Sequence, residues 1–212
     1  MTNTLQTLGA RFRSMLAPAP GVNPDDLADP DPTVRWRAIR ALARQQPQTD
    51  LLPQVLQLLT DPDPTIRYEA VLALSSWGPE PADLQPVVDL LASDPSSETT
   101  IAVLDLLGHL PIPAAHTLVQ DRLTHDDPQV RAAAAHALGT YDQSEDVELL
   151  APLTDDPIPD IRRAACLALT EIDDPTVPYV LRQHLRDPDP VTRQIAQQAI
   201  DNQQKKSNKT QD

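Results

Sequence analysis

Hydrophobic positions recur along this chain in clusters that have the spacing of a helix. The stretch from Val34 to Leu42 predicts an amphipathic helix, because its apolar residues share one face of a helical wheel. The stripe consists of Val34, Ala38, Ala41 and Leu42, and it returns as Ile66, Ala70, Ala73, Leu74 and as Val130, Ala134, Ala137, Leu138. The pattern predicts a series of similar helices, each with one face to bury.

The polar residues in front of these stripes repeat as well. The phrase Asp-Pro-Asp-Pro-Thr-Val-Arg at 29–35 returns as Asp-Pro-Asp-Pro-Thr-Ile-Arg at 61–67, and weaker copies follow. An alignment on Arg35 gives successive steps of 32, 33, 31, 31 and 31 residues. The aligned residues are Arg35, Arg67, Thr100, Arg131, Arg162 and Arg193. Such a period is typical of stacked two-helix units rather than of one closed domain.

Proline and aspartate mark where each helix begins and ends. Asp31 has the side chain of an N-cap and Pro32 suits the first helical position, so a helix should begin at Pro32. Pro30 disfavours helix in Asp29 and should end the preceding helix. That preceding helix is predicted by a second apolar run in each unit, at 51–59, 84–91, 114–123, 147–153 and 177–185.

These motifs resemble those of the HEAT repeat family, and in particular the bacterial subgroup similar to phycobilisome-lyase repeats. Val130-Arg131, Ala134-Ala135 and Ala137-Leu138-Gly139 match the end of the family pattern, and Pro53 and Pro86 match its early proline. The resemblance covers roughly residues 25 to 200. It implies an all-α fold, a right-handed α-solenoid of about six HEAT repeats. It does not specify a function, because the family includes scaffolds, adaptors and a few enzymes.

The resemblance also implies a structural ladder of Asp and Arg across adjacent loops. The residues that carry this role are Asp29/Arg35, Asp61/Arg67, Asp156/Arg162 and Asp187/Arg193. Thr100 replaces the Arg of the third unit and His125 replaces the Asp of the fourth. We therefore expect the ladder to be interrupted in the middle of the stack.

The two ends of the chain differ from the repeats. Residues 1–24 are expected to form an N-terminal capping helix and a Pro-rich linker, since the apolar residues of 4–16 fall on one helical face. A faint resemblance to a transit peptide is the alternative for this segment. Residues 25–202 should form the solenoid, and residues 203–212 should be a disordered polar tail because they contain no apolar residue.

Charge and composition narrow the classes of partner. The chain of 212 residues has a formal net charge of −14, which disfavours nucleic acid as a partner. The charge is uneven: six Arg and four Asp give +2 over residues 1–44, which leaves −16 for the rest. No apolar run is long enough for a signal peptide or a membrane span, so we expect a cytoplasmic protein, monomeric by itself and without membrane contact.

The sequence contains few residues arranged for catalysis or for binding a metal or a phosphate group. The five histidines are not spaced as metal ligands, none precedes a Glu, and five glycines leave little material for a phosphate loop. The single cysteine, Cys166, occupies a repeat position where other units carry apolar residues, so we expect it to pack in the core. We expect no metal, no cofactor and no catalytic residue, and hence not an enzyme.

One strip of residues indicates an interface with another protein. The positions one, five and nine after the repeat Arg lie on the side of the second helix away from the apolar stripe, and in the family that helix lines the concave surface. The candidate residues at these positions are Trp36, Arg40, Arg44, Tyr68, Leu72, Ile101 and Asp105, and Arg37 beside Trp36 is a further candidate. Trp, Tyr and Arg commonly anchor protein interfaces. The alternative is that Trp36 and Tyr68 fill gaps between repeats or pack against the N-terminal helix.

Three functions are compatible with these features. The first is a non-catalytic scaffold, adaptor or assembly factor that binds a partner protein in a concave groove. The second is an accessory subunit of a phycobilin lyase or a factor for phycobilisome maturation or degradation, which the repeat subgroup suggests. The third is a partner in metal-cluster assembly that uses Cys166.

Overall fold

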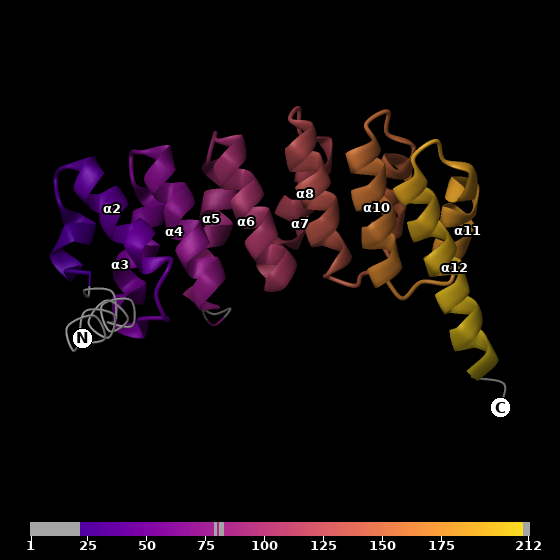
Figure 1. Ribbon diagram of the computed structural model, residues 1–212, viewed down its shortest axis with the longest axis horizontal. Helices are drawn as coiled ribbons and strands as arrows, with labels where there is room; N and C mark the ends of the chain where they lie inside the picture. The colour runs from indigo at the N-terminus through magenta and orange to yellow at the C-terminus, as the bar shows by residue number, and fades with distance from the viewer. Residues whose placement is uncertain (1–21, 79, 81–82, 210–212) are drawn as a thin grey trace, which may run out of the picture.

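The computed structural model of the chain describes residues 22–78, 80 and 83–209, with side chains as far as residue 201. Every regular element in these ranges is a helix. The helices form repeated pairs that stand side by side along the long axis of the molecule, from α2 at one end to α12 at the other (Figure 1). The predicted all-α solenoid is confirmed.

The second helix of each unit belongs to one continuous row. These helices are α2 (Pro32–Leu42), α4 (Pro64–Trp77), α6 (Ser97–His109), α8 (Pro128–Gly139), α10 (Pro159–Glu171) and α12 (Pro190–Lys209). Each contacts the next one in the row. We refer to the side of this row that carries the positions one, five and nine after the repeat Arg as the second-helix face.

The first helices are shorter and are flanked by 3-10 turns. They are η1 (Pro24–Ala28), η2 (Thr49–Leu51) with α3 (Leu52–Gln57) and η3 (Leu58–Thr60), α5 (Gln85–Ser93), η5 (Pro113–Ala115) with α7 (His116–Asp121) and η6 (Arg122–Thr124), α9 (Asp146–Leu150) with η7 (Ala151–Asp155), and α11 (Val177–Leu181) with η8 (Arg182–Arg186). In the first unit, the described part of the first helix is therefore a single 3-10 helix of five residues.

The second helices begin where the Asp-Pro pattern predicts. Asp31 accepts a hydrogen bond from the Thr33 amide at 2.8 Å, and Pro32 is the first helical residue. The earlier Asp of the phrase closes the turn in front of the cap, because Asp29 accepts from the Asp31 amide at 2.8 Å. Both features follow from the local sequence alone.

The apolar stripes meet in one continuous core. The leucines that share one repeat position have no exposed surface, as predicted; they are Leu42, Leu74, Leu138 and Leu169. Cys166 also has no exposed surface, which confirms its place in the core. With few aromatic residues, the core consists mainly of Leu, Ala, Val and Ile contacts spread along the stack.

Small residues bring neighbouring second helices close together. A Cβ placed on Gly139 of α8 would lie 2.7 Å from the Cα of Ala168 in α10. At Gly108 of α6 the nearest atom would be the Cα of Ala137 in α8, at 3.6 Å. Ala137 and Ala168 both stand six residues after the repeat Arg. This position therefore faces the preceding unit.

The chain ends differ from the expected boundaries in one respect. Helix α12 continues to Lys209, although the segment from residue 203 was expected to be disordered. The segment 203–209 contains neither Pro nor Gly, and Gln and Lys are good helix formers, so the helix propagates beyond the last packed turn. The expected N-terminal capping helix lies outside the described residues.

Candidate functional site

The aromatic residues of the predicted strip lie on the second-helix face. Trp36 of α2, Tyr68 of α4 and Ile101 of α6 occupy the same position in three consecutive units, one residue after the repeat Arg or Thr100. All three are half-buried and pack against the core with part of their surface. They therefore combine a packing role with an accessible edge.

Trp36 makes a cation–π contact with Arg40. The guanidinium carbon of Arg40 lies 4.7 Å from the centre of the indole ring, one helical turn further along α2. Arg40 also approaches Glu69 of α4, with 3.9 Å between Nε and Oε1, and its side chain remains 43% exposed. The stacked pair thus presents a flat apolar ring edge and a positive charge to solvent.

Tyr68 and Ile101 form the floor of a shallow depression between α4 and α6. Its remaining lining comes from the starts of the two helices, namely Pro64, Thr65, Ser96 and Glu98. Glu98 is exposed, and a hydrogen bond from its own backbone N–H, together with one from the Ser96 hydroxyl at 2.9 Å, holds its pKa below the ordinary value. The depression therefore has an apolar floor and one negatively charged edge.

The other candidate residues are distributed along the same helices. Leu72 is half-buried on α4, whereas Asp105 of α6 and Arg44, which follows the end of α2, are exposed. Within the described residues, the Asp105 carboxylate makes no ion pair. Arg37 lies elsewhere, because it lines a depression at the N-terminal end of the stack with Val34 and Ala38. One residue further along a helix means a rotation of about 100°, which turns Arg37 away from Trp36.

Sequence reasoning missed Glu69 and Glu98, which supply the acidic groups beside Arg40 and Tyr68. Glu69 directly follows Tyr68, but its contact with Arg40 depends on how α2 and α4 are offset. No spacing within one unit gives that offset. Surface contacts between neighbouring units are therefore visible only in the folded chain.

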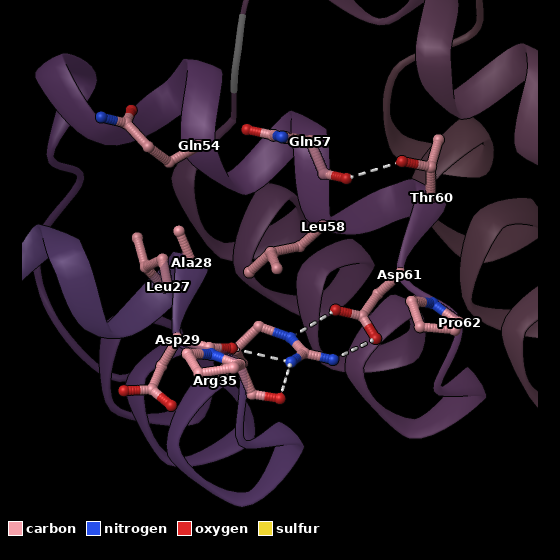
Figure 2. Close-up of a pocket in the computed structure, with 11 residues that line it drawn as sticks. Leu27, Ala28, Asp29, Arg35, Gln54, Gln57, Leu58, Thr60, Asp61 and Pro62 are labelled. Atoms are coloured by element: carbon pink, nitrogen blue, oxygen red, sulfur yellow. Dashed lines mark hydrogen bonds and ion pairs between the residues drawn. The ribbon is translucent and has the colours of Figure 1, made fainter.

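The recurring Arg and Asp positions of the repeat phrase form a network of hydrogen bonds and ion pairs along the loops. Arg35 donates from Nε to Asp61 Oδ2 at 2.7 Å and from Nη2 to Asp61 Oδ1 at 3.0 Å (Figure 2). Its Nη1 donates to the carbonyl oxygens of Asp29 and Pro30. The carboxylate partner thus belongs to the next unit, and the partner within the same phrase is a backbone carbonyl. The matching hydrogen bonds of other units join Arg67 to Asp94 and Arg162 to Asp187. Arg131 and Asp156 form a longer ion pair, with 3.8 Å between Nη2 and Oδ2.

Three positions of this ladder differ from the regular pairing of Asp with Arg. Asp94 stands six residues before Thr100 and accepts from Arg67, a spacing that the sequence contains but that we did not assign. Among the described residues of the third and fourth units, no such bond joins the phrases, since Thr100 offers no guanidinium and His125 no carboxylate. The His125 ring instead accepts from the Asp127 amide at 3.0 Å and so replaces the Asp in its local turn. At the C-terminal end, Arg193 bonds only to the carbonyls of Asp187 and Pro188 among the described residues.

A cavity beside the first bond of the ladder does not offer a binding site of its own. It is lined by Arg35, Asp61, Leu58 and the loop residues around them (Figure 2). The Arg35 guanidinium already makes four hydrogen bonds there, and both oxygens of Asp61 accept from it. The charged groups of this cavity are therefore engaged in holding the first two units together.

The closest pairing of a histidine with a carboxylate is also internal. His116 Nε2 lies 2.7 Å from Asp146 Oδ2, and Gln120 donates to Asp146 Oδ1 at 2.7 Å. Asp146 has no exposed surface. The pair joins α7 to α9 and satisfies a buried carboxylate, which is a structural role.

Cys166 offers no reactive thiolate. Burial raises the pKa of its thiol to about 12, and the side chain has no exposed surface. A neutral, enclosed thiol is neither a good nucleophile nor an accessible metal ligand. In the part of the chain that the structure describes, no three His, Cys, Asp or Glu side chains are grouped to hold a metal, and no helix is long and apolar enough to cross a membrane.

Comparison with protein families and solved structures agrees with this architecture. The family model described as HEAT repeats matches residues 26–108 and 117–201. No curated protein sequence matches the chain significantly.

Several solved structures share the fold. An engineered protein has a TM-score of 0.67 and 21% identity over 84% of this chain and 96% of its own. A designed armadillo repeat protein in complex with the peptide (KR)4 has a TM-score of 0.65 and 17% identity over 84% of this chain and 96% of its own. The complex of CpcE and CpcF of phycocyanin lyase from Nostoc sp. PCC7120 has a TM-score of 0.65 and 19% identity over 84% and 76%. At these identities the likeness is one of fold.

Proposed function

Because the chain belongs to the HEAT repeat family, we propose that it is a non-catalytic scaffold or adaptor that binds a partner protein along its second-helix face. The fold does not decide between the many functions of such repeats, so the surface must carry the argument. The observation that carries it is the row of Trp36, Tyr68 and Ile101 on three consecutive units, with Arg40 stacked on the indole. Aromatic and Arg side chains with an apolar base are frequent anchors of interfaces.

The charges around this row indicate what kind of partner would fit. Arg40 and Arg44 make the α2 part of the second-helix face positive, whereas Glu98 and Asp105 make its α6 part negative. A partner segment with an acidic group at one end and a basic group at the other would match both. Such a pattern would set the direction in which the segment lies and raise the rate of association.

The solved structures support a role in binding in general terms. A designed armadillo repeat protein of similar fold is in complex with the peptide (KR)4, and CpcE and CpcF form a complex with each other. On this basis we propose a protein partner. From the net charge of −14 and the sequence pattern we also propose that the chain does not bind nucleic acid and is monomeric in the cytoplasm until it meets that partner. The sequence analysis, which expects no catalytic residue, agrees with this role.

A subunit of a bilin lyase is the second candidate. It is favoured by the likeness to a chain of the CpcE and CpcF complex, 76% of which is covered by this chain. Under this proposal, the protein isolated from its native cell would carry a visible bilin absorption band or bring a bilin-binding protein with it. A colourless preparation with an unrelated partner would reject the lyase role. Metal-cluster assembly through Cys166 is not supported, because the thiol is enclosed in the core.

The scaffold role is tested by measuring affinity for a partner identified by capture from the native cell and then purified. Trp36→Ala or Tyr68→Ala should raise Kd by about 30-fold, which corresponds to about 2 kcal/mol for an anchor residue. Tyr179→Ala is the matched control, since Tyr179 lies on α11 in the other row of helices and is 79% exposed. Arg40→Glu should mainly slow association.

Stability has to be measured on the same variants, because Trp36 and Tyr68 also pack against the core. Affinity is therefore compared at a temperature where each variant is fully folded. Normal affinity of both folded variants would reject the second-helix face as the interface. In that case the acidic surface of the later units would be the next region to examine.

A further inference from the structure

The first unit exposes a surface at the N-terminal end of the stack. In each later unit the equivalent surface is covered by the preceding unit. The position six after the repeat Arg faces the preceding unit, as the close approach of Gly108 to Ala137 and of Gly139 to Ala168 demonstrates. In the first unit this position is Ala41. Ala41 therefore faces outward at the end of the stack, where no preceding second helix is present within the described residues.

The exposure of the first unit agrees with this geometry. In the second unit Ile66 and Ala73 have no exposed surface, whereas their counterparts Val34 and Ala41 are partly exposed. Ala38, the counterpart of Ala70, is buried. Helix η1 covers only part of this end, through the buried side chain of Leu27. The uncovered part is a depression whose apolar lining consists of Val22, Val34, Ala38 and Ala41, and we call it the α2 end face.

We propose that residues 4–16 of the same chain bind as an amphipathic helix to the α2 end face and take the place of the missing preceding unit. The segment is joined to the chain close to this face, because the described chain starts at Val22, which itself lines the depression. Leu5, Leu8, Phe12 and Leu16 share one face of a helix. The proposal does not depend on the partner-binding role.

The dimensions of the segment fit the face. A helix of residues 4–16 is about 20 Å long, and α2 with its 11 residues is about 16 Å long. The linker 17–21 can span up to about 17 Å when extended, which is enough for the chain to fold back along α2. The segment therefore has the reach and the length to cover the whole end face.

Charge complements this fit. The segment contains Arg11 and Arg13 and no acidic residue. On a helix these two arginines fall on opposite edges of the apolar face, roughly 100° from its centre. The end face is lined by one carboxylate, Asp26, and one base, Arg37. Asp25 precedes Asp26 in the first turn of η1. An arginine at one edge of the segment can therefore pair with Asp26 while the apolar residues of the segment cover Val34 and Ala41.

Substitutions in the full-length chain test this placement. Leu8→Asp and Phe12→Asp put a charge on the apolar face of the segment, whereas Ser14→Asp puts the same charge on its opposite face and is the matched control. Hydrogen exchange of the α2 amides is measured for each variant, together with the melting temperature and the molar mass by sedimentation. None of these substitutions touches the described stack, so each variant should fold.

We expect the α2 amides to exchange about tenfold faster in Leu8→Asp and Phe12→Asp than in the parent chain, with a lower melting temperature, because α2 then frays at an uncovered end. Ser14→Asp should match the parent. Equal α2 exchange in all four proteins would overturn the proposal. It would also be overturned if α2 protection in the parent were lost on dilution as a dimer dissociated, since a second copy would then be the occupant.

Discussion

Arg35 and Asp61, which are 26 residues apart in sequence, are joined by two parallel hydrogen bonds of 2.7 and 3.0 Å that hold the first unit to the second. Their side chains are only 13% and 5% exposed. The same guanidinium also binds two carbonyl oxygens of its own loop. One side chain thus closes a local turn and a joint between units at the same time.

The first prediction compares an inner Arg with the last one. Arg67→Ala should destabilise the protein by about 3 kcal/mol, because it leaves the nearly buried Asp94 carboxylate without its counter-charge. Arg193→Ala should cost only about 1 kcal/mol, since Arg193 bonds to carbonyls alone among the described residues. Urea unfolding of both variants measures the difference. Equal losses would mean that the carboxylate contributes nothing to the joint.

The second prediction concerns the loss of stability at acidic pH. Hydrogen bonds from Arg162 lower the pKa of Asp187 below its ordinary value, although burial acts in the opposite direction. A lowered folded-state pKa means that this stabilisation is present above the unfolded value of about 3.9 and is lost as pH falls through the folded value. The free energy of unfolding should therefore decrease as the pH is lowered below about 5 and Asp187 becomes protonated.

Asp187→Asn isolates this contribution. The variant should be less stable than the parent at pH 7 and should lose less stability on acidification, as followed by urea unfolding at several pH values. Asp105→Asn serves as a control, because Asp105 is exposed and makes no ion pair within the described residues. If Asp187→Asn kept the full acid sensitivity of the parent, other groups would have to account for it.

The third prediction uses two glycines that face the next helix at different distances. Gly139→Ala should cost about 1 to 3 kcal/mol, because the new Cβ would lie 2.7 Å from the Ala168 Cα and 2.9 Å from its carbonyl oxygen. Gly108→Ala should be neutral or stabilising by up to about 1 kcal/mol, since its nearest contact is 3.6 Å and Ala is the better helix former. Thermal unfolding distinguishes them, and the opposite order would contradict the packing described for α8 and α10.

The fourth prediction concerns the thiol. Cys166 should react with a thiol reagent at pH 8 more than about a hundredfold more slowly in the native protein than in denaturant, because it is enclosed and its pKa is raised to about 12. Its modification rate should follow the unfolding of the stack. Rapid labelling of the native protein would show that the Cys166 thiol is accessible to solvent and would again favour a role in metal-cluster assembly.

The sequence by itself determined the architecture of this protein. Asp31 and Pro32 mark a helix start, the stripe from Val34 to Leu42 marks its buried face, and the 31 to 33 residue period marks the stack. All of these are relations between residues within one helix or one loop. Backbone geometry and side-chain spacing fix them without reference to the rest of the fold.

The tertiary structure decided which neighbour each side chain meets. Arg35 binds the carboxylate of Asp61 rather than that of Asp29, and Arg37 points to the end of the stack rather than to Trp36's side. Glu69 comes beside Arg40 only because α4 packs against α2 with a particular offset. Close packing between helices is likewise decided by the folded chain: Gly139 of α8 lies against Ala168 of α10, and this contact spans two units.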